Sequence, residues 1–422
     1  MTQAIRLAIL SSINLGLGFV FQWFLLTKLG AGTEVDAFFA GMAIPQFVLA
    51  IVSGSLMHVL VPLLAGEDEA SLSHDAWAFF LLVVGFFGFI AVFLYLTASW
   101  WVPWSVPGFS LISQELTVKL TQIQLIGMVF SAAHGVQWAA YHARKKFIWA
   151  EVAPTLANAL AFVLLLVFLP DFGVVAAAWI GTFRLGIQTL FLLPGLGRPI
   201  APNFKKISVS SAWSRIKPLI LGTAYYKTDP ILDRVLLSSS TSGSLSLYYF
   251  AQQIYAALNS IINKSIVSPL VPQFSEFYKE KKFKELKNSY RYGVFGVSCL
   301  VVIFAFVFIF WGSFFLGKLI GYGDFHQNDV LGLWWIMIWL IGAFAGGVLG
   351  QISSSMFYSM GDTSTPTRIS VLVYTVYMPI KVVLYFNFGI AGLAFSTSCF
   401  FLINLIIQNK IIFRYFRKIE TK

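Results

Sequence analysis

Four ionisable side chains lie close together within an otherwise apolar stretch of the sequence, residues 216–240. Lys227 and Arg234 are seven positions apart, so on an α-helix they point within about 20° of each other. Asp229 and Asp233, four positions apart, share a second face on nearly the opposite side. The basic face suits an anionic group such as a pyrophosphate, and the acidic face suits a coupling Na⁺ or H⁺. Alternatively, the four groups form ion pairs that hold neighbouring helices together.

The composition of the chain indicates what surrounds this segment. Of its 422 residues, 58% are hydrophobic and 11% are charged, and the mean hydropathy is +0.78. Globular domains are about 45 to 50% apolar and about 25% charged, so this chain has too little polar surface to coat a water-soluble globule. We therefore predict an all-α membrane protein that crosses the bilayer many times, and we exclude a soluble enzyme.

A membrane-spanning helix needs roughly 20 consecutive apolar residues, and on this criterion we predict about twelve spans. Short joints containing Gly separate the fifth span from the sixth, at 170–173, and the eleventh from the twelfth, at 385–389. The predicted spans are residues 5–28, 37–64, 77–101, 119–142, 152–170, 173–194, 216–238, 246–272, 291–317, 330–357, 368–387 and 388–409.

Lys and Arg residues lie almost entirely in alternate loops. Placing both termini in the cytoplasm puts 21 of them on the cytoplasmic side and three on the opposite side. Cytoplasmic loops of membrane proteins carry such an excess, so we predict that both termini are cytoplasmic. The formal charge of +11 is then a topology signal that also gives affinity for anionic membrane lipids, notably in the amphipathic run 278–291. We expect no nucleic-acid partner.

The two halves of the sequence resemble each other. A shift of 210 residues lays the stretch that begins at Ala37 over the stretch that begins at Leu247, and a similar shift pairs FGVVAA at Phe172 with FGIAGL at Phe388. Because six is an even number of spans, two six-helix lobes would enter the membrane from the same side as parallel repeats. The predicted lobes are residues 1–195 and 218–422, and the predicted basic cytoplasmic linker is 196–217.

Charged side chains inside a bilayer cost at least a few kcal/mol each, so they usually face a cavity or a partner. Pro230 lies between Asp229 and Asp233 and removes one backbone donor, which bends a helix. We therefore expect the seventh span to line a cleft between the lobes. Arg184 in the sixth span and Lys264 in the eighth are single charges that either line the same cleft or form structural pairs.

The sequence contains no motif of a nucleotide-driven pump or a metallohydrolase, since GxxxxGK[ST], the Rossmann fingerprint and HExxH are all missing. Cys299 and Cys399 lie in apolar runs and belong to no metal-ligand spacing. We therefore predict a transporter rather than an enzyme, without a metal or an organic cofactor. Its energy would come from a Na⁺ or H⁺ gradient, from the membrane potential or from the gradient of the substrate.

Several short motifs follow one another in an order found in a known family. They are LGAGTEVDAFFAGMAIPQ (29–46), VPGF (106–109), APTLAN (153–158), YYFAQQIY (248–255), FYSMGDTSTP (357–366) and GIAGLAFS (389–396). By these motifs the chain resembles the MurJ (MviN) lipid II flippases of the MOP exporter superfamily over most of its length, as a short member with twelve helices.

This resemblance implies an inverted-V bundle of two six-helix lobes. It also implies transport of an undecaprenyl-pyrophosphate-linked saccharide from the inner to the outer leaflet by alternating access. In the family, an acid of the seventh helix contributes to a cation site. That acid would be Asp233 here, with Asp362 as a second contributor.

The sequence departs from these flippases where they carry charged cavity residues. Leu15, Phe21 and Thr27 stand where the first helix of the family has arginines, and Gln252 and Gln253 replace an Asp-Arg pair of the eighth helix. We therefore expect a cationic cavity rebuilt from other residues. The predicted substrate-binding residues are Lys227, Arg234, Lys264, Arg184, Gln252 and Gln253, and the predicted cation-coupling residues are Asp233, Asp229 and Asp362.

Three functions remain open at this point. The leading hypothesis is a flippase for a polyprenyl-pyrophosphate-linked saccharide, lipid II or a related cell-envelope glycan precursor, in a bacterial inner membrane. The second is a cation-coupled exporter of small amphipathic compounds, which transport dependent on Asp229 or Asp233 would favour. The third is a membrane scaffold that recruits glycan-synthesis enzymes through its basic loops, which loss of function after loop charge removal would favour.

Overall fold

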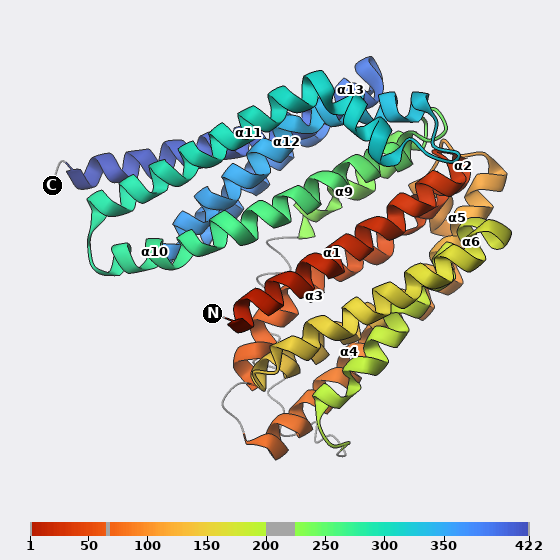
Figure 1. The fold of residues 1–422 in the computed structure, drawn as a ribbon, viewed down its shortest axis with the longest axis horizontal. Helices are drawn as coiled ribbons and strands as arrows, with labels where there is room; N and C mark the ends of the chain where they lie inside the picture. The colour runs from red at the N-terminus through yellow and green to blue at the C-terminus, as the bar shows by residue number, and fades with distance from the viewer. Residues whose placement is uncertain (1, 65–67, 200–223, 421–422) are drawn as a thin grey trace. The chain divides into compact units, whose positions relative to one another are not determined.

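The computed structural model describes residues 2–64, 68–199 and 224–420. Every regular element in these three ranges is helical, so the prediction of an all-α chain is confirmed. Contacts within the chain divide it into two compact units, Met1–Leu245 and Ser246–Lys422. In Figure 1 the ribbon runs from the red helices at the N-terminus to the blue helix at the C-terminus.

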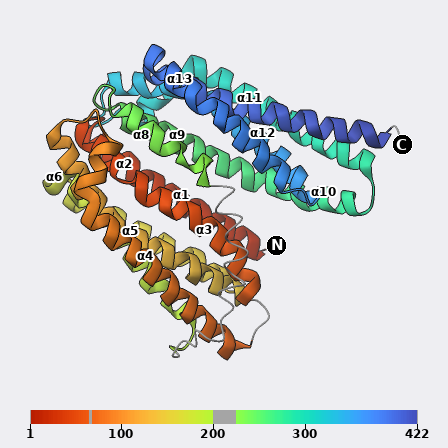
Figure 2. The same cartoon turned by 180° about the vertical axis from the view of Figure 1, so that it is seen from behind.

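The first unit is a bundle of long helices. α1 packs against α6, α3 packs against α5, and α5 lies between α4 and α6, as the views from both sides show (Figures 1 and 2). Its elements are α1 (Thr2–Leu29), α2 (Thr33–Gly41), α3 (Ala43–Leu64), α4 (Glu69–Ser105), α5 (Leu111–Ala143), α6 (Phe147–Leu192), the 3₁₀ turns η1 (Leu193–Leu196) and η2 (Tyr226–Thr228), and α8 (Asp229–Leu237).

The second unit is built in a similar way. α12 packs against both α11 and α13, and α10 packs against α11 and α12 (Figure 2). Its elements are α9 (Ser244–Ile262), which begins at the end of the first unit, the π-helical turn η3 (Asn263–Val267), α10 (Ser268–Lys279), α11 (Phe283–Ile320), α12 (Gln327–Ser359) and α13 (Ser364–Glu420).

α6 and α13 are each two helices joined at a glycine. Gly173 has φ 56° and ψ −145°, and Gly389 has φ 59° and ψ −140°. The indole N–H of Trp149 donates to the carbonyl of Phe191, 42 residues later in α6, at 2.9 Å. A straight helix of that length would separate them by roughly 63 Å, so the chain reverses at Gly173. The two predicted hairpin joints are therefore confirmed.

Eight of the helices in the described ranges are long and apolar enough to span a membrane. Two of them, Phe147–Leu196 and Ser364–Ile419, contain the glycine reversals and so supply two passes each. The continuous helical path from α9 to α10 matches the eighth predicted span. α8 lies in the seventh predicted span, of which residues 216–223 fall outside the described structure. The prediction of a polytopic membrane protein with about twelve spans is confirmed.

The internal repeat is visible in the lengths and breaks of the helices. α4 and α5 have 37 and 33 residues, and α11 and α12 have 38 and 33. Each series ends in a hairpin that reverses at a glycine with nearly the same backbone angles, Gly173 in α6 and Gly389 in α13. These lengths and breaks support the predicted internal repeat, and the parallel relation of its two halves stays a prediction.

The contacts divide the chain at Leu245 rather than within the predicted linker. α8 packs against α3 and α4 of the first unit, and the backbone N–H of Gly243 donates to Asp36 Oδ2 at 2.7 Å. Most of the predicted linker, 196–217, lies outside the described residues. The predicted lobes 1–195 and 218–422 and the linker between them therefore stay a prediction.

The break between α2 and α3 follows from Pro45. Because Pro45 has no backbone N–H, it cannot donate to the carbonyl of Gly41 four residues earlier. Helical bonding resumes at Gln46, whose N–H donates to the carbonyl of Met42 at 3.0 Å. Gly41 also packs tightly, since a Cβ there would lie 3.1 Å from Thr121 Oγ1 on α5. This bend shapes one wall of the site described below.

The predicted seventh span is not a continuous α-helix through its charged residues. The 3₁₀ turn η2 precedes α8, and Pro230 lies in the first turn of α8. Asp229 donates its backbone N–H to the carbonyl of Tyr226, three residues earlier. The 3₁₀ turn shifts the register of Lys227 relative to Arg234, and the Lys227 side chain is exposed whereas that of Arg234 is buried. The predicted basic face stays a prediction.

α4 and α11 expose long apolar surfaces. On α4, Phe89, Leu96 and Trp100 are each 74% exposed, and on α11 Phe295 is 70% exposed. In water, apolar surface on this scale marks an interaction site or an aggregation hazard, but against lipid tails it carries no such cost. These two helices therefore present the lipid-facing surfaces of their units.

Candidate functional site

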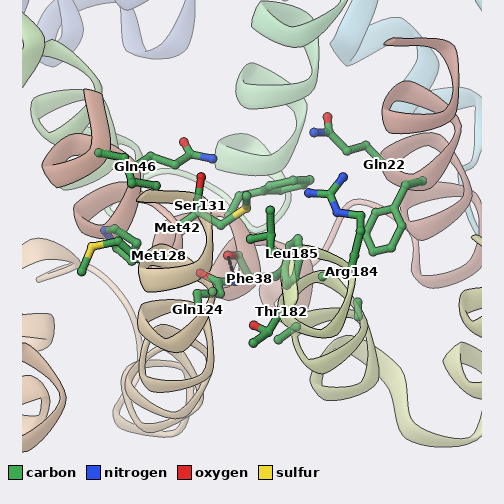
Figure 3. Close-up of a pocket in the computed structure, with 18 of the residues that line it drawn as sticks. Gln22, Phe38, Met42, Gln46, Gln124, Met128, Ser131, Thr182, Arg184 and Leu185 are labelled. Atoms are coloured by element: carbon green, nitrogen blue, oxygen red, sulfur yellow. Dashed lines mark hydrogen bonds between the residues drawn. The ribbon is translucent and has the colours of Figure 1, made fainter. Parts of the chain in front are cut away.

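A cavity of about 220 Å³ lies inside the first unit, among α1, α2, α3, α5 and the second half of α6 (Figure 3). Arg184, on the wall of this cavity, lies roughly 16 Å along the helix from the chain reversal at Gly173. This is about half the thickness of the hydrocarbon core of a bilayer, so the cavity lies near the middle of the membrane. The residues that line it are Gly18, Phe21, Gln22, Phe38, Phe39, Met42, Pro45, Gln46, Leu49, Gln124, Gly127, Met128, Ser131, Ala177, Ala178, Gly181, Thr182, Arg184 and Leu185.

Small residues on α1 and α6 leave room for this cavity. A Cβ on Gly18 or Gly181 would meet no atom within 4 Å. At Gly127 on α5, by contrast, a Cβ would lie 3.2 Å from Thr182 Oγ1, so α5 and α6 approach each other closely at this point. The space is therefore bounded by helices that pack tightly around it.

Arg184 is the one charged side chain among the described residues that line the cavity. Its Nη1 donates to Asn158 Oδ1 at 2.6 Å, and its guanidinium carbon lies 6.0 Å from the centre of the Phe21 ring. Asn158 in turn donates from Nδ2 to Asn14 Oδ1 on α1. The guanidinium is therefore held in a fixed orientation by α1 and by both halves of α6.

Two glutamines contribute carboxamide oxygens that have no hydrogen-bond partner in the described structure. Gln124 donates from Nε2 to the carbonyl of Phe38 at 3.2 Å, which orients the side chain, and its Oε1 is buried and unpaired. Gln22 Oε1 is also buried and unpaired. Leaving such an atom unpaired costs roughly 1 to 3 kcal/mol. Both oxygens therefore require donors, such as ligand hydroxyls or water.

The arrangement of these groups fits a ligand that is both anionic and hydroxylated. Figure 3 shows Arg184 and Gln22 on one side of the cavity, with Gln46 and Ser131 across from them. A guanidinium binds phosphate oxygens through paired N–H donors, and amide and hydroxyl side chains exchange hydrogen bonds with hydroxyl groups. A purely apolar compound would leave the buried oxygens of Gln22 and Gln124 unpaired.

Arg234 donates two hydrogen bonds to backbone carbonyls. Its Nη1 donates to Pro230 at 2.6 Å and its Nε donates to Phe39 at 3.4 Å. Phe39 lies near the C-terminal end of α2, where unpaired carbonyls and the helix dipole favour a cation. These contacts join α8 to α2 within the first unit. The headgroup role predicted for Arg234 and for the exposed Lys227 stays a prediction.

The predicted cation-coupling acids lie in three different settings. Asp233 is buried in α8, with 2% of its surface exposed, and Asp229 is half-buried at the start of α8. Asp362 belongs to the other unit and lies just before α13. Within the described residues, no group of three or more His, Cys, Asp or Glu side chains could hold a metal ion. Coupling of a cation by the three acids stays a prediction.

Asp362 caps the N-terminus of α13. Its Oδ1 accepts hydrogen bonds from the backbone N–H of Thr365 at 2.9 Å and from the N–H and hydroxyl of Ser364, each at 3.1 Å. Hydrogen bonds from Thr365 and Ser364 lower the pKa of the Asp362 carboxyl below its ordinary value. The stabilisation is therefore present above the unfolded pKa and is lost as the pH falls through the folded pKa.

Asp362→Asn should therefore remove part of the acid sensitivity of the folded protein. A carboxamide oxygen still caps the helix, so we expect near wild-type thermal stability at neutral pH and a smaller loss than in the wild type below about pH 4. Thermal unfolding of the purified protein across this range measures the effect. Asp324→Asn, at an exposed turn residue, is the matched control. Loss of transport by Asp362→Asn at neutral pH would instead support the predicted coupling role.

The other predicted residues lie in the second unit. Gln252 lines a separate cavity there, and the described lining does not include the adjacent Gln253. Lys264 is exposed in the π-helical turn η3, where Pro269 cannot donate to the carbonyl of Ser265. The structure thus places Arg184 in one cavity and Gln252 in another, and the described lining of neither contains the remaining predicted basic residues.

Sequence patterns did not single out Gln22, Gln124 or Asn158 as site residues. All three are amide side chains within predicted spans, and this is the signal that finds them. An amide is neutral, so a search for ionised groups overlooks it. It also costs less than a charge inside a bilayer, so its presence there is less conspicuous. Lys381, within the eleventh predicted span, is completely buried, and its Nζ lies 5.1 Å from the centre of the Tyr377 ring.

The family of the chain follows from a match to a family model. The model described as lipid II flippase MurJ matches residues 25–421. The chain belongs to the MurJ lipid II flippase family. The probable lipid II flippase MurJ of Buchnera aphidicola subsp. Acyrthosiphon pisum is 23% identical over 437 residues, which cover 99% of this chain and 84% of the relative. That of Vibrio cholerae is 21% identical over 432 residues, covering 96% and 81%.

Solved structures show the same fold as this MurJ-family chain. A lipid II flippase MurJ in an inward closed conformation has a TM-score of 0.84 at 17% identity, covering 97% of this chain and 87% of that one. An inward-facing multidrug resistance transporter of the MATE family and MOP superfamily has a TM-score of 0.80 at 15% identity, covering 98% and 99%. The MOP-type fold expected from the sequence motifs is therefore confirmed.

Proposed function

We propose that this MurJ-family chain flips a polyprenyl-pyrophosphate-linked saccharide, lipid II or a related cell-envelope glycan precursor, from the inner to the outer leaflet of a bacterial cytoplasmic membrane. The observation that carries the proposal is the mid-bilayer cavity whose lining includes Arg184 and the unpaired oxygens of Gln22 and Gln124. Membership of the MurJ family supports the class of substrate.

The cavity suits the part of such a lipid that cannot cross a membrane unaided. Burying an unpaired charge in hydrocarbon costs several kcal/mol or more, whereas a polyprenyl tail is soluble in lipid. Arg184 would replace part of the hydration of the pyrophosphate, and the glutamine amides would bond to hydroxyl groups. A volume of about 220 Å³ holds part of the headgroup, so the tail remains in the bilayer.

The direction of transport rests on the proposed topology. Arg144 closes one end of the first unit, with its Nε 2.8 Å from Glu69 Oε1 and its Nη1 donating to the carbonyl of Gly195 at 2.6 Å. The basic loops predicted to be cytoplasmic begin at this end. In the second unit, residues 278–291 form the turn between α10 and α11 and the start of α11 rather than a separate surface helix. This turn would face anionic lipids of the inner leaflet.

Alternating access is the mechanism we propose, with the cavity open to one side of the membrane at a time. The sequence has no nucleotide-binding loop, so the energy would come from an ion gradient, from the membrane potential or from the gradient of the substrate. If an ion is coupled, Na⁺ or H⁺ at Asp233 or Asp229 is the arrangement we propose.

Reconstitution into liposomes tests this function. With fluorescently labelled lipid II in the vesicles, a membrane-impermeant quencher reports how fast the labelled headgroup changes leaflet. We expect the protein to raise the flipping rate well above that of protein-free vesicles. Imposed Na⁺ and pH gradients, applied one at a time, should identify the coupling ion by a change in the rate.

A matched experiment separates this proposal from the exporter. The same vesicles are loaded with ethidium, a cationic amphipathic compound, and its movement is followed by fluorescence. A flippase should move the labelled lipid and leave ethidium transport at the protein-free rate. Ethidium transport combined with lipid flipping at the protein-free rate would overturn the proposal in favour of drug export, and no transport of either would favour a scaffold.

A further inference from the structure

The second unit contains a cavity of its own, of about 210 Å³. Three elements supply its walls: α9 on one side, α12 on another and the second half of α13 on the third. The residues that line it are Gln252, Tyr255, Ala256, Asn259, Leu340, Ala343, Phe344, Gly347, Thr397 and Phe401.

Asn259 brings an unsatisfied hydrogen-bond acceptor to this cavity. Its Oδ1 is buried and has no hydrogen-bond partner in the described structure. Gly347 on α12 leaves space for the amide, because a Cβ there would lie 3.3 Å from Asn259 Nδ2. Gln252 lies seven residues earlier on α9, two helical turns away and on the same face. Two carboxamides therefore line one wall, and one of their oxygens lacks a donor.

Aromatic rings form a rigid part of the wall. Tyr255 and Phe344 stack with their ring centres 5.1 Å apart and their planes 19° apart. Phe304 packs against Phe344 with the ring centres 5.3 Å apart. The Tyr255 hydroxyl donates to the carbonyl of Met337 at 2.8 Å, which fixes the ring. Flat apolar surface beside convergent amides is a combination that a partly apolar, partly polar ligand can use.

The described lining of the cavity contains no Asp, Glu, Lys, Arg or His. Lys381 lies one layer behind this wall: Thr397 Oγ1 is 3.1 Å from the Tyr377 hydroxyl, and the Tyr377 ring lies 5.1 Å from Lys381 Nζ. A charged ligand would therefore find no counter-ion on the wall, and burying it would be costly. The cavity of the first unit differs, since Arg184 lies on its wall.

We propose that the cavity lined by Gln252 and Asn259 is a binding subsite for a neutral monosaccharide ring. One edge of the ring would donate hydroxyl hydrogen bonds to Asn259 Oδ1 and to the Gln252 amide, and its apolar face would pack against the aromatic wall. The inference rests on the proposed function, because it assigns a site to the sugar of the lipid-linked substrate. The cavity volume equals that of roughly seven water molecules in the liquid. This space holds one sugar ring but not a lipid tail.

Saturation-transfer NMR on the full-length purified protein tests the subsite without any transport step. The probes are free N-acetylglucosamine and free glucose, each titrated to obtain a dissociation constant. Asn259→Leu removes the amide at nearly constant size and should weaken sugar binding about fivefold or more, as expected for the loss of one hydrogen bond. Ala256→Leu, which fills the cavity from α9, should also weaken it. Asn263→Leu changes a nearby residue outside the described lining and should leave it unaltered.

The outcomes separate the subsite from the transport function. Absence of saturation transfer to both sugars in the wild type would overturn the subsite, and so would equal dissociation constants for the wild type and the two cavity variants. Asn259→Leu should also slow the flipping of labelled lipid II more than that of undecaprenyl pyrophosphate without sugar. If the wild type binds sugar and Asn259→Leu does not, the subsite is supported whether or not the protein flips lipid. If the wild type binds sugar but flips no lipid, only the proposed function is overturned.

Discussion

Arg184→Gln should lower the affinity for undecaprenyl pyrophosphate by roughly tenfold to a hundredfold, the range expected for the loss of a hydrogen bond to a charged group. Arg184 is the charged residue on the described wall of the first cavity, and Asn158 and Phe21 hold it in place. Glutamine keeps a donor for Asn158 but carries no charge. The flipping rate of labelled lipid II should fall together with the affinity.

Three comparisons make this result specific. Arg198→Gln is the same substitution at an exposed residue and should leave the affinity unchanged. Arg184→Lys keeps the charge but loses the planar fork, so an intermediate loss is expected. Undecaprenol, which has the tail without the phosphates, should bind wild type and Arg184→Gln equally. Equal affinity of Arg184→Gln and the wild type for the pyrophosphate, with both proteins folded, would contradict a role of this cation in headgroup binding.

The fold could be predicted well because its causes are local. The joints at 170–173 and 385–389 could be identified from the sequence because each places glycine after a long apolar run, and both glycines have backbone angles that other residues rarely adopt. The spans could be identified because bilayer thickness fixes their length. The repeat could be detected because similar helices in the two halves carry similar residues at corresponding positions.

The sites could be predicted only in part, because they depend on side chains brought together from distant parts of the chain. Arg184 could be found as a charge inside an apolar span, and Gln252 through its departure from the related flippases. Asn158, which bonds to Arg184, and Asn259, which lines the same cavity as Gln252, are amides that neither signal marks. The basic face expected for Lys227 and Arg234 assumed a continuous α-helix. Pro230 replaces part of that helix by a 3₁₀ turn, and this changes the direction in which every preceding side chain points.

The backbone of α13 gives the second prediction with a large effect. Gly389 has φ 59° and ψ −140°, a conformation that is essentially restricted to glycine. A Cβ at this position would meet no atom within 4 Å. Gly389→Ala therefore introduces backbone strain without a steric clash, and we expect it to destabilise the folded protein by about 1 to 3 kcal/mol. The melting temperature of the purified protein should fall by several degrees.

Gly350→Ala is the matched control, since Gly350 lies inside α12 and a Cβ there would also meet no atom within 4 Å. Alanine is favoured over glycine in a helix by about 0.5 to 1 kcal/mol, so the control should be neutral or stabilising while Gly389→Ala is destabilising. Gly173→Ala should resemble Gly389→Ala, because the two glycines share the same reversal. If Gly389→Ala and Gly350→Ala melted at the same temperature, a reversal that depends on glycine would be refuted, and α13 would tolerate any small residue where its two helices meet.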